Sequence, residues 1–144
     1  MTRTEWWMRL SPFVAGFNDG HTSVFYPSEE ILRKLEGGAL LFPVDVTVDE
    51  DRRLLVSAVY GDGAGLQLGG RIVELNGRPL EELLADWKKE FSGESDIYLA
   101  ATVADHFRDL LVLHSPDISW FRHPPAIAKP VAMPSSSARG TARL

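Results

Sequence analysis

The most constraining feature of this sequence is a strand, a tight turn and a helix that follow one another without a break. Residues 71–75 are predicted to form a strand, and Asn76-Gly77 is the dipeptide typical of a two-residue hairpin turn. Pro79 then stands at the start of an amphipathic helix. This succession favours an α+β fold, with the helix packed on a small sheet through its apolar residues Leu80, Leu83, Leu84, Trp87 and Phe91.

A hairpin is predicted upstream of this unit. In residues 39–48 the apolar side chains alternate with a set that becomes polar at Asp45 and Thr47, which is the period-two pattern of a half-buried strand. Pro43 favours an edge position for that strand. An acidic turn leads into a second strand over residues 54–60, so the two strands are expected to pair.

Three further helices are predicted. Ser28 is a suitable N-cap for a short helix that ends at Gly37, and a longer one is expected to begin at Ser95 and to run to Leu111. Residues 4–17 form a helical pattern in which Pro12 either introduces a kink or starts a second turn. The apolar face of this first helix is made of Trp6, Leu10, Phe13, Val14 and Phe17.

Composition divides the chain of 144 residues into unlike parts. Residues 116–144 hold four basic residues and one acid, net +3, and five of the nine prolines. Residues 1–115 hold 11 basic against 19 acidic residues, net -8. We therefore predict an N-terminal helical segment over 1–36, a sheet-containing module over 37–115 and a disordered Pro/Ser-rich basic tail over 116–144.

Composition also excludes several classes of protein. The absence of cysteine removes disulfide scaffolds, thiol catalysis and cysteine zinc sites. No run approaches the roughly 18 apolar residues of a membrane span, and the first ten residues lack the apolar core of a signal peptide. A cytoplasmic protein is expected from the sequence as written, or an exported one if an N-terminal segment precedes it. The net charge of -5 weighs against nucleic acid as a partner, and no pattern indicates a metal or a cofactor.

His21 is the titratable residue with the strongest claim to a catalytic role. Asp19 stands two positions away, and a carboxylate can orient an imidazole or raise its pKa. The alternative is a plain turn, because Asn18, Asp19 and Gly20 are residues that turns favour. A short strand is expected to follow over residues 23–26.

The order of these segments resembles the front part of the tail-specific, or C-terminal processing, serine peptidases and their tricorn-like relatives. Those proteins carry a helical segment ending in a motif of the type Asp-Gly-His-Thr, which is Asp19-Gly20-His21-Thr22 in this chain. A PDZ-like module follows, whose hallmark matches residues 64–79 (AGLQLGGRIVELNGRP), with Gly70 where the family pattern has Asp. The resemblance covers roughly residues 5–115.

This resemblance implies a PDZ-like mixed sheet with flanking helices that binds a polypeptide or a peptide C-terminus. It further implies that His21 acts as general base for a serine that lies much later in the chain in tricorn-like relatives, with Asp19 as a possible orienting group. In the processing-peptidase branch a serine and a lysine do the chemistry instead, and His21 would then have no catalytic role. The residues expected to line the peptide groove are Leu40, Phe42, Val44, Leu80, Leu83, Leu84 and Trp87. The alternative, favoured for most of them, is ordinary packing in the core.

Two functions stay open from the sequence. The first is a partial serine peptidase that lacks the nucleophile domain, is inactive alone, and gains activity if a separate serine-domain subunit supplies the nucleophile. The second is a stand-alone peptide-binding module without an enzymatic role. In either case residues 116–144 can be a premature or shifted end of the reading frame, because their composition changes so abruptly.

Overall fold

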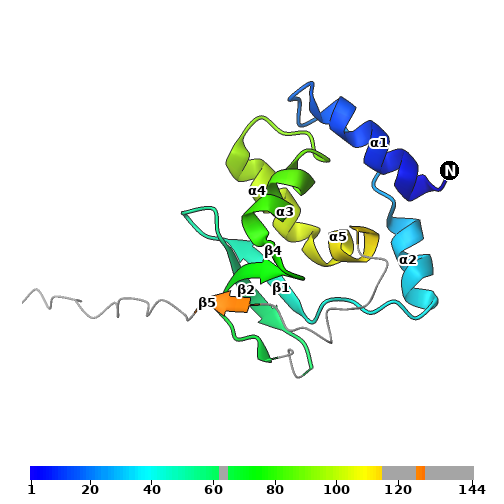
Figure 1. The fold of residues 1–144 in the computed structure, drawn as a ribbon. Coiled ribbons are helices and arrows are strands. Elements are labelled where there is room, and N and C mark those ends of the chain that lie inside the picture. The colour runs from blue at the N-terminus through cyan, green and yellow to red at the C-terminus, as the bar shows by residue number, and fades with distance from the viewer. Residues whose placement is uncertain (62–64, 115–125, 129–144) are drawn as a thin grey trace, which may run out of the picture.

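The computed structural model describes residues 1–61 and 65–114, and the backbone of residues 126–128. Two helices precede a sheet, and three further helices pack against it, so the fold class is α+β as predicted (Figure 1). The elements in chain order are α1 (Arg3–Ala15), α2 (Ser28–Glu36), β1 (Val44–Val48), β2 (Leu54–Val59), β3 (Arg71–Leu75), β4 (Arg78–Pro79), α3 (Leu80–Lys88), α4 (Asp96–Asp105), α5 (Phe107–His114) and β5 (Ala126–Ala128).

The sheet is built on the predicted hairpin of β1 and β2. These strands pair antiparallel from Val48 opposite Leu54, with a bulge between Asp45 and Val46. β2 meets β3 at Leu55 and Arg71, and β3 pairs with both β4 and β5. Every strand pair among the described residues is antiparallel, where the resemblance implied a mixed sheet.

β5 belongs to the segment 116–144 that was expected to be disordered. Its backbone pairs with β3, with Ala128 opposite Arg71 and Ala126 opposite Glu74. The structure therefore describes residues 126–128 as a strand, and the rest of that segment lies outside the described residues.

The tight turn between β3 and β4 is the predicted Asn-Gly turn. Asn76 has φ 50° and Gly77 has φ 76°, and Leu75 pairs with Arg78 across it. Positive φ at both central residues is the geometry of a type I′ turn, whose twist matches that of the flanking strands.

Helix α1 extends through Pro12 without ending there. Thr2 and Glu5 form a capping box at its start, and the Ser11 hydroxyl donates to the Trp7 carbonyl at 2.6 Å. Its buried residues are Thr4, Trp7 and Ser11, whereas Trp6, Leu10, Phe13 and Phe17 are exposed. Most of the apolar face identified in the sequence is thus on the outside of the helix, because Trp7 takes the core position.

Two other local predictions differ from the structure. The helix expected from Ser95 onward is divided into α4 and α5 at His106, although Ser95 is its N-cap as predicted. The strand expected over residues 23–26 does not form. Those residues instead lead into α2 and place Tyr26 against Trp7, with ring centroids 5.2 Å apart.

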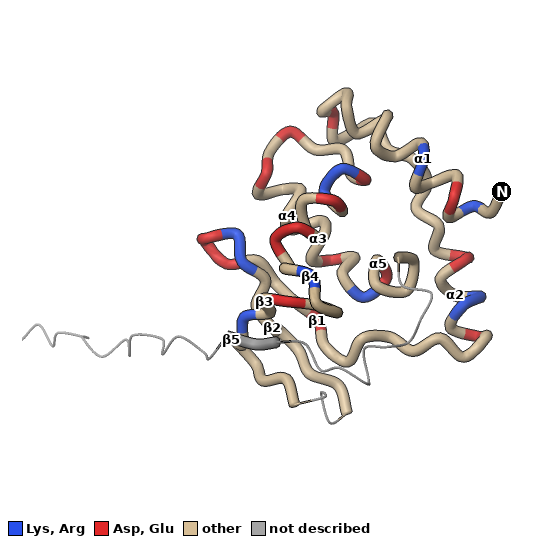
Figure 2. The backbone as a smooth tube through the Cα atoms, in the orientation of Figure 1, with Lys and Arg blue, Asp and Glu red and all other residues tan. Residues whose placement is uncertain are grey.

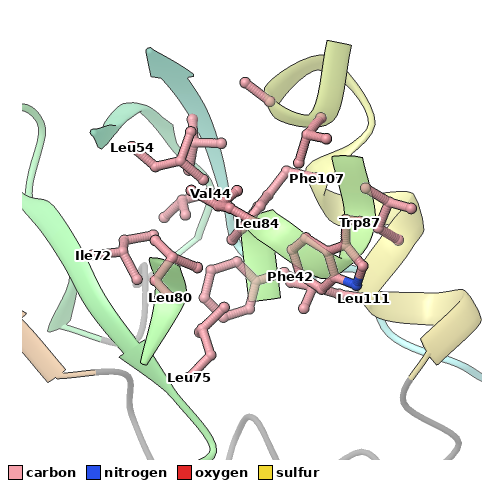
Figure 3. Packing of buried hydrophobic residues seen from close by; sticks show 14 of the residues in the cluster. Phe42, Val44, Leu54, Ile72, Leu75, Leu80, Leu84, Trp87, Phe107 and Leu111 are labelled. Carbon is pink, nitrogen blue, oxygen red and sulfur yellow. The ribbon is translucent and has the colours of Figure 1, made fainter. Parts of the chain in front are cut away.

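The core lies between the sheet and helices α3, α4 and α5 (Figure 3). At its centre the Phe107 ring meets Phe42 and Trp87 edge to face, with centroids 5.8 and 5.9 Å apart. The sheet contributes Val44, Leu54, Val56, Ile72 and Leu75, and the helices contribute Leu80, Leu84, Val103, Leu110 and Leu111, among others.

Candidate functional site

The Asp19–Thr22 segment forms an exposed turn just after α1. Asp19 Oδ1 accepts a hydrogen bond from the His21 backbone N–H at 3.0 Å, and its Oδ2 accepts one from the Thr22 hydroxyl at 2.6 Å. The same Oδ1 lies 3.3 Å from His21 Nδ1. The motif Asp-Gly-His-Thr is therefore a closed loop in which one carboxylate holds the backbone, the hydroxyl and the imidazole.

The charge of Asp19 is favoured by these contacts. The hydrogen bond from the Thr22 hydroxyl, and then that from the His21 backbone, hold the pKa of the Asp19 carboxyl below its usual value. An ionised Asp19 favours the tautomer of His21 that carries its proton on Nδ1, and this leaves Nε2 as a proton acceptor.

Exposure limits what this pair can do in the chain as described. The side chain of His21 is 94% exposed and that of Asp19 is 45% exposed, so water screens the contact between them. The ring of His21 has Asp19 as its hydrogen-bond partner among the described residues, and no described serine hydroxyl bonds to it. The geometry provides an oriented base without a nucleophile.

The residues expected to line a peptide groove are placed mainly in the core. Phe42, Val44, Leu80, Leu84 and Trp87 are buried, Leu83 is half-buried, and Leu40 is exposed before β1.

The chain's own helix α4 accounts for this burial. It packs against both β1 and α3, the two elements that were expected to flank the groove, and it buries Ala100, Val103 and Ala104. The burial of Phe42, Val44 and Trp87 closes that part of the predicted groove to a peptide in this structure. Leu80 and Leu84 also line an open cleft.

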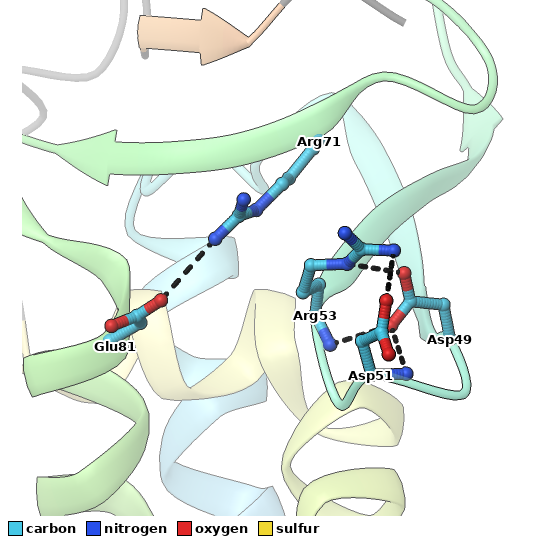
Figure 4. Close-up of polar contacts among 5 residues, drawn as sticks. All are labelled: Asp49, Asp51, Arg53, Arg71 and Glu81. Atoms are coloured by element: carbon cyan, nitrogen blue, oxygen red, sulfur yellow. Dashed lines mark hydrogen bonds and ion pairs between the residues drawn. The ribbon is translucent and has the colours of Figure 1, made fainter. Parts of the chain in front are cut away.

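An open cleft lies between β2, β3 and α3. Its volume is about 590 Å³, and its lining includes the apolar side chains of Leu54, Ile72, Leu80 and Leu84 beneath a charged rim. Across the cleft Arg71 Nη2 contacts Glu81 Oε1 at 3.3 Å (Figure 4). This cleft was not predicted from the sequence. β2 and β3 were expected as strands, but the place where they stop pairing, next to Leu55 and Arg71, depends on the tertiary structure.

One end of the cleft is held by the loop between β1 and β2 (Figure 4). Arg53 contacts both Asp49 and Asp51 at 2.7 Å, and Asp49 Oδ1 accepts the backbone N–H groups of Asp51 and Arg53. Burial acts to raise the pKa of Asp49, but the hydrogen bonds from Arg53 outweigh it and lower that pKa below its usual value. The guanidinium of Arg53 is therefore already paired with two carboxylates of its own loop.

A second network joins that loop to the helices. Asp96 Oδ2 accepts a hydrogen bond from Arg52 Nη1 at 2.7 Å, and Asp96 Oδ1 accepts one from Lys88 Nζ at 2.8 Å. The hydrogen bonds from Lys88 and then from Arg52 lower the pKa of Asp96. Arg71 differs from these cations, because its contact is long and its partner Glu81 is 85% exposed. Among the cations on the cleft rim, Arg71 is thus the one that can most readily exchange the Glu81 carboxylate for a carboxylate of a ligand.

Among the described residues, no group of three or more His, Asp or Glu side chains is placed to hold a metal ion. The same residues include no helix with the length and apolar character needed to cross a membrane. Comparisons of the chain with family models, with curated proteins and with solved structures found no match.

Proposed function

We propose that this chain is the front portion of a serine peptidase of the tail-specific or tricorn-like type, which supplies a general-base histidine and a polypeptide-binding module but not the nucleophile. The observation that supports this most directly is the pairing of Asp19 with His21. The carboxylate contacts Nδ1 at 3.3 Å and leaves Nε2 open to solvent. This is the orientation that a histidine needs to accept a proton from a serine hydroxyl.

The proposed mechanism assigns one task to each group. Asp19 selects the tautomer and orientation of the imidazole, and it stabilises the imidazolium once Nε2 has taken the proton of the serine. The serine and the oxyanion hole must come from outside the described residues. A surface that covers His21 would exclude water and thereby strengthen the Asp19 contact.

A serine-directed covalent probe tests this proposal. The purified full chain is expected neither to cleave unstructured peptides nor to react with a fluorophosphonate. When it is added to a cell extract of its source, it is expected to increase fluorophosphonate labelling of a serine protein. The variant His21→Gln should abolish that increase, whereas Ser23→Ala, which changes an exposed hydroxyl in the same loop, should preserve it.

Two results would contradict the proposal. Turnover by the chain alone would show that it already holds a nucleophile. An increase in labelling that is the same with wild type and with His21→Gln would show that the imidazole has no part in activation. Melting curves of both variants check that each is folded.

A second candidate function, a stand-alone peptide-binding module, is favoured by the open cleft at Arg71. Its apolar floor and its exchangeable arginine suit an extended peptide with a free carboxylate. Fluorescence anisotropy with unstructured peptides would compare wild type with Arg71→Gln. The matched control is Arg78→Gln, which breaks a comparable exposed ion pair with Asp86. Equal affinities of all three proteins, or no binding by the wild type, would exclude this site.

A further inference from the structure

Helix α1 presents apolar side chains on two faces, and only one of them is buried. Trp7 on the inner face packs against Tyr26 and Phe91. The outer face carries Trp6, Leu10 and Phe13, and Phe17 continues the row in the turn just after the helix. We term these four residues the α1 stripe; they are 50%, 38%, 71% and 63% exposed in chain order.

The spacing of the α1 stripe is four, three and four residues, which is the spacing of a helix–helix seam. The charged residues of α1 are Arg3, Glu5 and Arg9, and none follows Arg9 in the helix (Figure 2). Packing such a surface against another apolar helix is more favourable than leaving it exposed to water.

The two ends of the stripe have different shapes. At the N-terminal end Trp6 and Leu10 form one side of a groove of about 450 Å³, and the other side includes Phe25, which is 98% exposed. At the C-terminal end Phe13 and Phe17 project together, edge to face, with ring centroids 5.7 Å apart. One end is thus concave and the other convex.

From this complementarity we infer that the α1 stripe is the interface of a symmetric dimer, in which the α1 helices of two copies of this chain pack antiparallel about a two-fold axis near Leu10. In that arrangement the Phe13 and Phe17 pair of each copy enters the groove between Trp6 and Phe25 of the other. The same contact is made twice, as a two-fold interface requires. It also brings the N-terminal end of one helix, where Arg3 pairs with Glu29 of its own chain, toward the turn that holds Asp19 in the other.

The area of the stripe is sufficient for such a contact. A buried aromatic side chain covers roughly 150–250 Å², so the exposed fractions of Trp6, Phe13, Phe17 and Phe25 amount to on the order of 500 Å² per copy. A symmetric pair would bury about 1,000 Å² from these rings alone, which reaches the lower limit of specific protein interfaces. Leu10 and the flanking backbone add to this.

The inference does not rest on the proposed peptidase function. The stripe ends at Phe17, four positions before His21 in the sequence, and the dimer requires neither a nucleophile nor a peptide ligand.

Sedimentation velocity over a dilution series of the full chain tests the dimer. Wild type is expected to sediment as a dimer that dissociates on dilution, because self-association depends on concentration. The double variant Phe13→Glu/Phe17→Glu should be a monomer throughout, since four carboxylates would meet in the two grooves. Leu68→Glu removes another side chain that is 66% exposed, and it should leave the dimer intact.

The absence of cysteine permits a direct test of the arrangement. Leu10→Cys should form a disulfide-linked dimer under mild oxidation, because the two-fold axis brings this position next to its own copy. Phe17→Cys should not, because antiparallel packing separates the two copies of this residue by roughly 20 Å along the helix axis at about 1.5 Å per residue. Circular dichroism of each variant checks that the chain stays folded.

Three outcomes would overturn the inference. The first is a wild-type protein that is monomeric at every concentration. This outcome counts against the dimer even if the monomer binds phospholipid vesicles through Phe13 and Phe17. The second is loss of the dimer by Leu68→Glu to the same extent as by the double variant. The third is efficient cross-linking through Phe17→Cys, which would mean parallel rather than antiparallel helices.

Discussion

The ring of Phe107 meets the ring of Phe42 edge to face, with centroids 5.8 Å apart, and this contact joins α5 to the segment that enters β1. Both side chains are 1% exposed. Nearby, Arg108 Nε donates to the Phe42 carbonyl at 2.8 Å, so the backbone and the side chain of Phe42 are held by neighbouring residues of one helix. The start of the sheet is therefore anchored from α5.

Phe107→Ala should strongly destabilise the protein. The substitution leaves a cavity between Phe42, Trp87 and the sheet, and removal of a buried Phe typically costs about 3–5 kcal/mol. Urea unfolding followed by tryptophan fluorescence measures the loss. Leu68→Ala is the control, because this side chain is 66% exposed and its truncation should change the free energy of unfolding by no more than about 0.5 kcal/mol. Equal losses for the two variants would contradict the described core.

Gly77→Ala should destabilise the hairpin of β3 and β4. Gly77 has φ 76° and has no atom near the position of an added Cβ, so the cost arises from backbone strain and should be about 1–2 kcal/mol. Gly20→Ala is the matched control, since its site is equally open but its φ is not positive. Thermal unfolding of both variants provides the comparison, and a harmless Gly77→Ala would exclude the type I′ geometry.

Asp49 should stabilise the fold in a way that depends on pH. Its pKa in the folded chain lies below the ordinary value of 3.8, so the ionised form stabilises the native state at neutral pH. That contribution is lost as the pH falls through the range below 3.8, where the folded carboxyl takes up its proton.

Asp49→Asn should therefore be less stable than wild type at neutral pH, and the difference should shrink in acid. Urea unfolding at a series of pH values tests this. A difference that is constant with pH would mean that the ionised carboxylate does not act through its hydrogen bonds with Arg53.

Asp19→Asn should change the tautomer of His21. An ionised carboxylate 3.3 Å from Nδ1 favours the proton on that nitrogen, whereas an amide in its place can offer a donor instead. Nitrogen-15 chemical shifts of the imidazole, recorded where His21 is neutral, would show a shift of the proton toward Nε2. Thr22→Val is an informative companion, because it removes the 2.6 Å hydrogen bond to Asp19 Oδ2 but leaves the carboxylate in place. An unchanged tautomer in Asp19→Asn would remove the structural basis for a base role of His21.

Several local elements could be predicted because their causes are local. Asn76-Gly77 has positive φ at both residues, as this dipeptide favours in tight turns, and Ser95 caps the helix that follows by accepting from the Tyr98 backbone N–H at 3.2 Å. The closed turn around Asp19 and His21 is of the same kind, since its hydrogen bonds span only two or three residues.

The candidate peptide groove could not be predicted in the same way. Leu80, Leu84 and Trp87 would lie on one helix face whether that face bordered a peptide or a core. The structure places α4 against β1 and α3, and the open cleft, which includes Leu80 and Leu84, is found where β2 and β3 diverge near Arg71. Both facts depend on contacts between segments that lie far apart in the sequence.

The sequence by itself determined the α+β class, the turn at Asn76 and the existence of a helix in residues 4–17, because turn chemistry and hydrophobic period act over a few neighbouring residues. Only the tertiary structure decided which face of that helix is buried. Trp6 and Trp7 are adjacent and equally apolar, so either could have pointed inward. Trp7 is buried because Tyr26 and Phe91 surround its ring, and this leaves Trp6 and the rest of the α1 stripe on the surface.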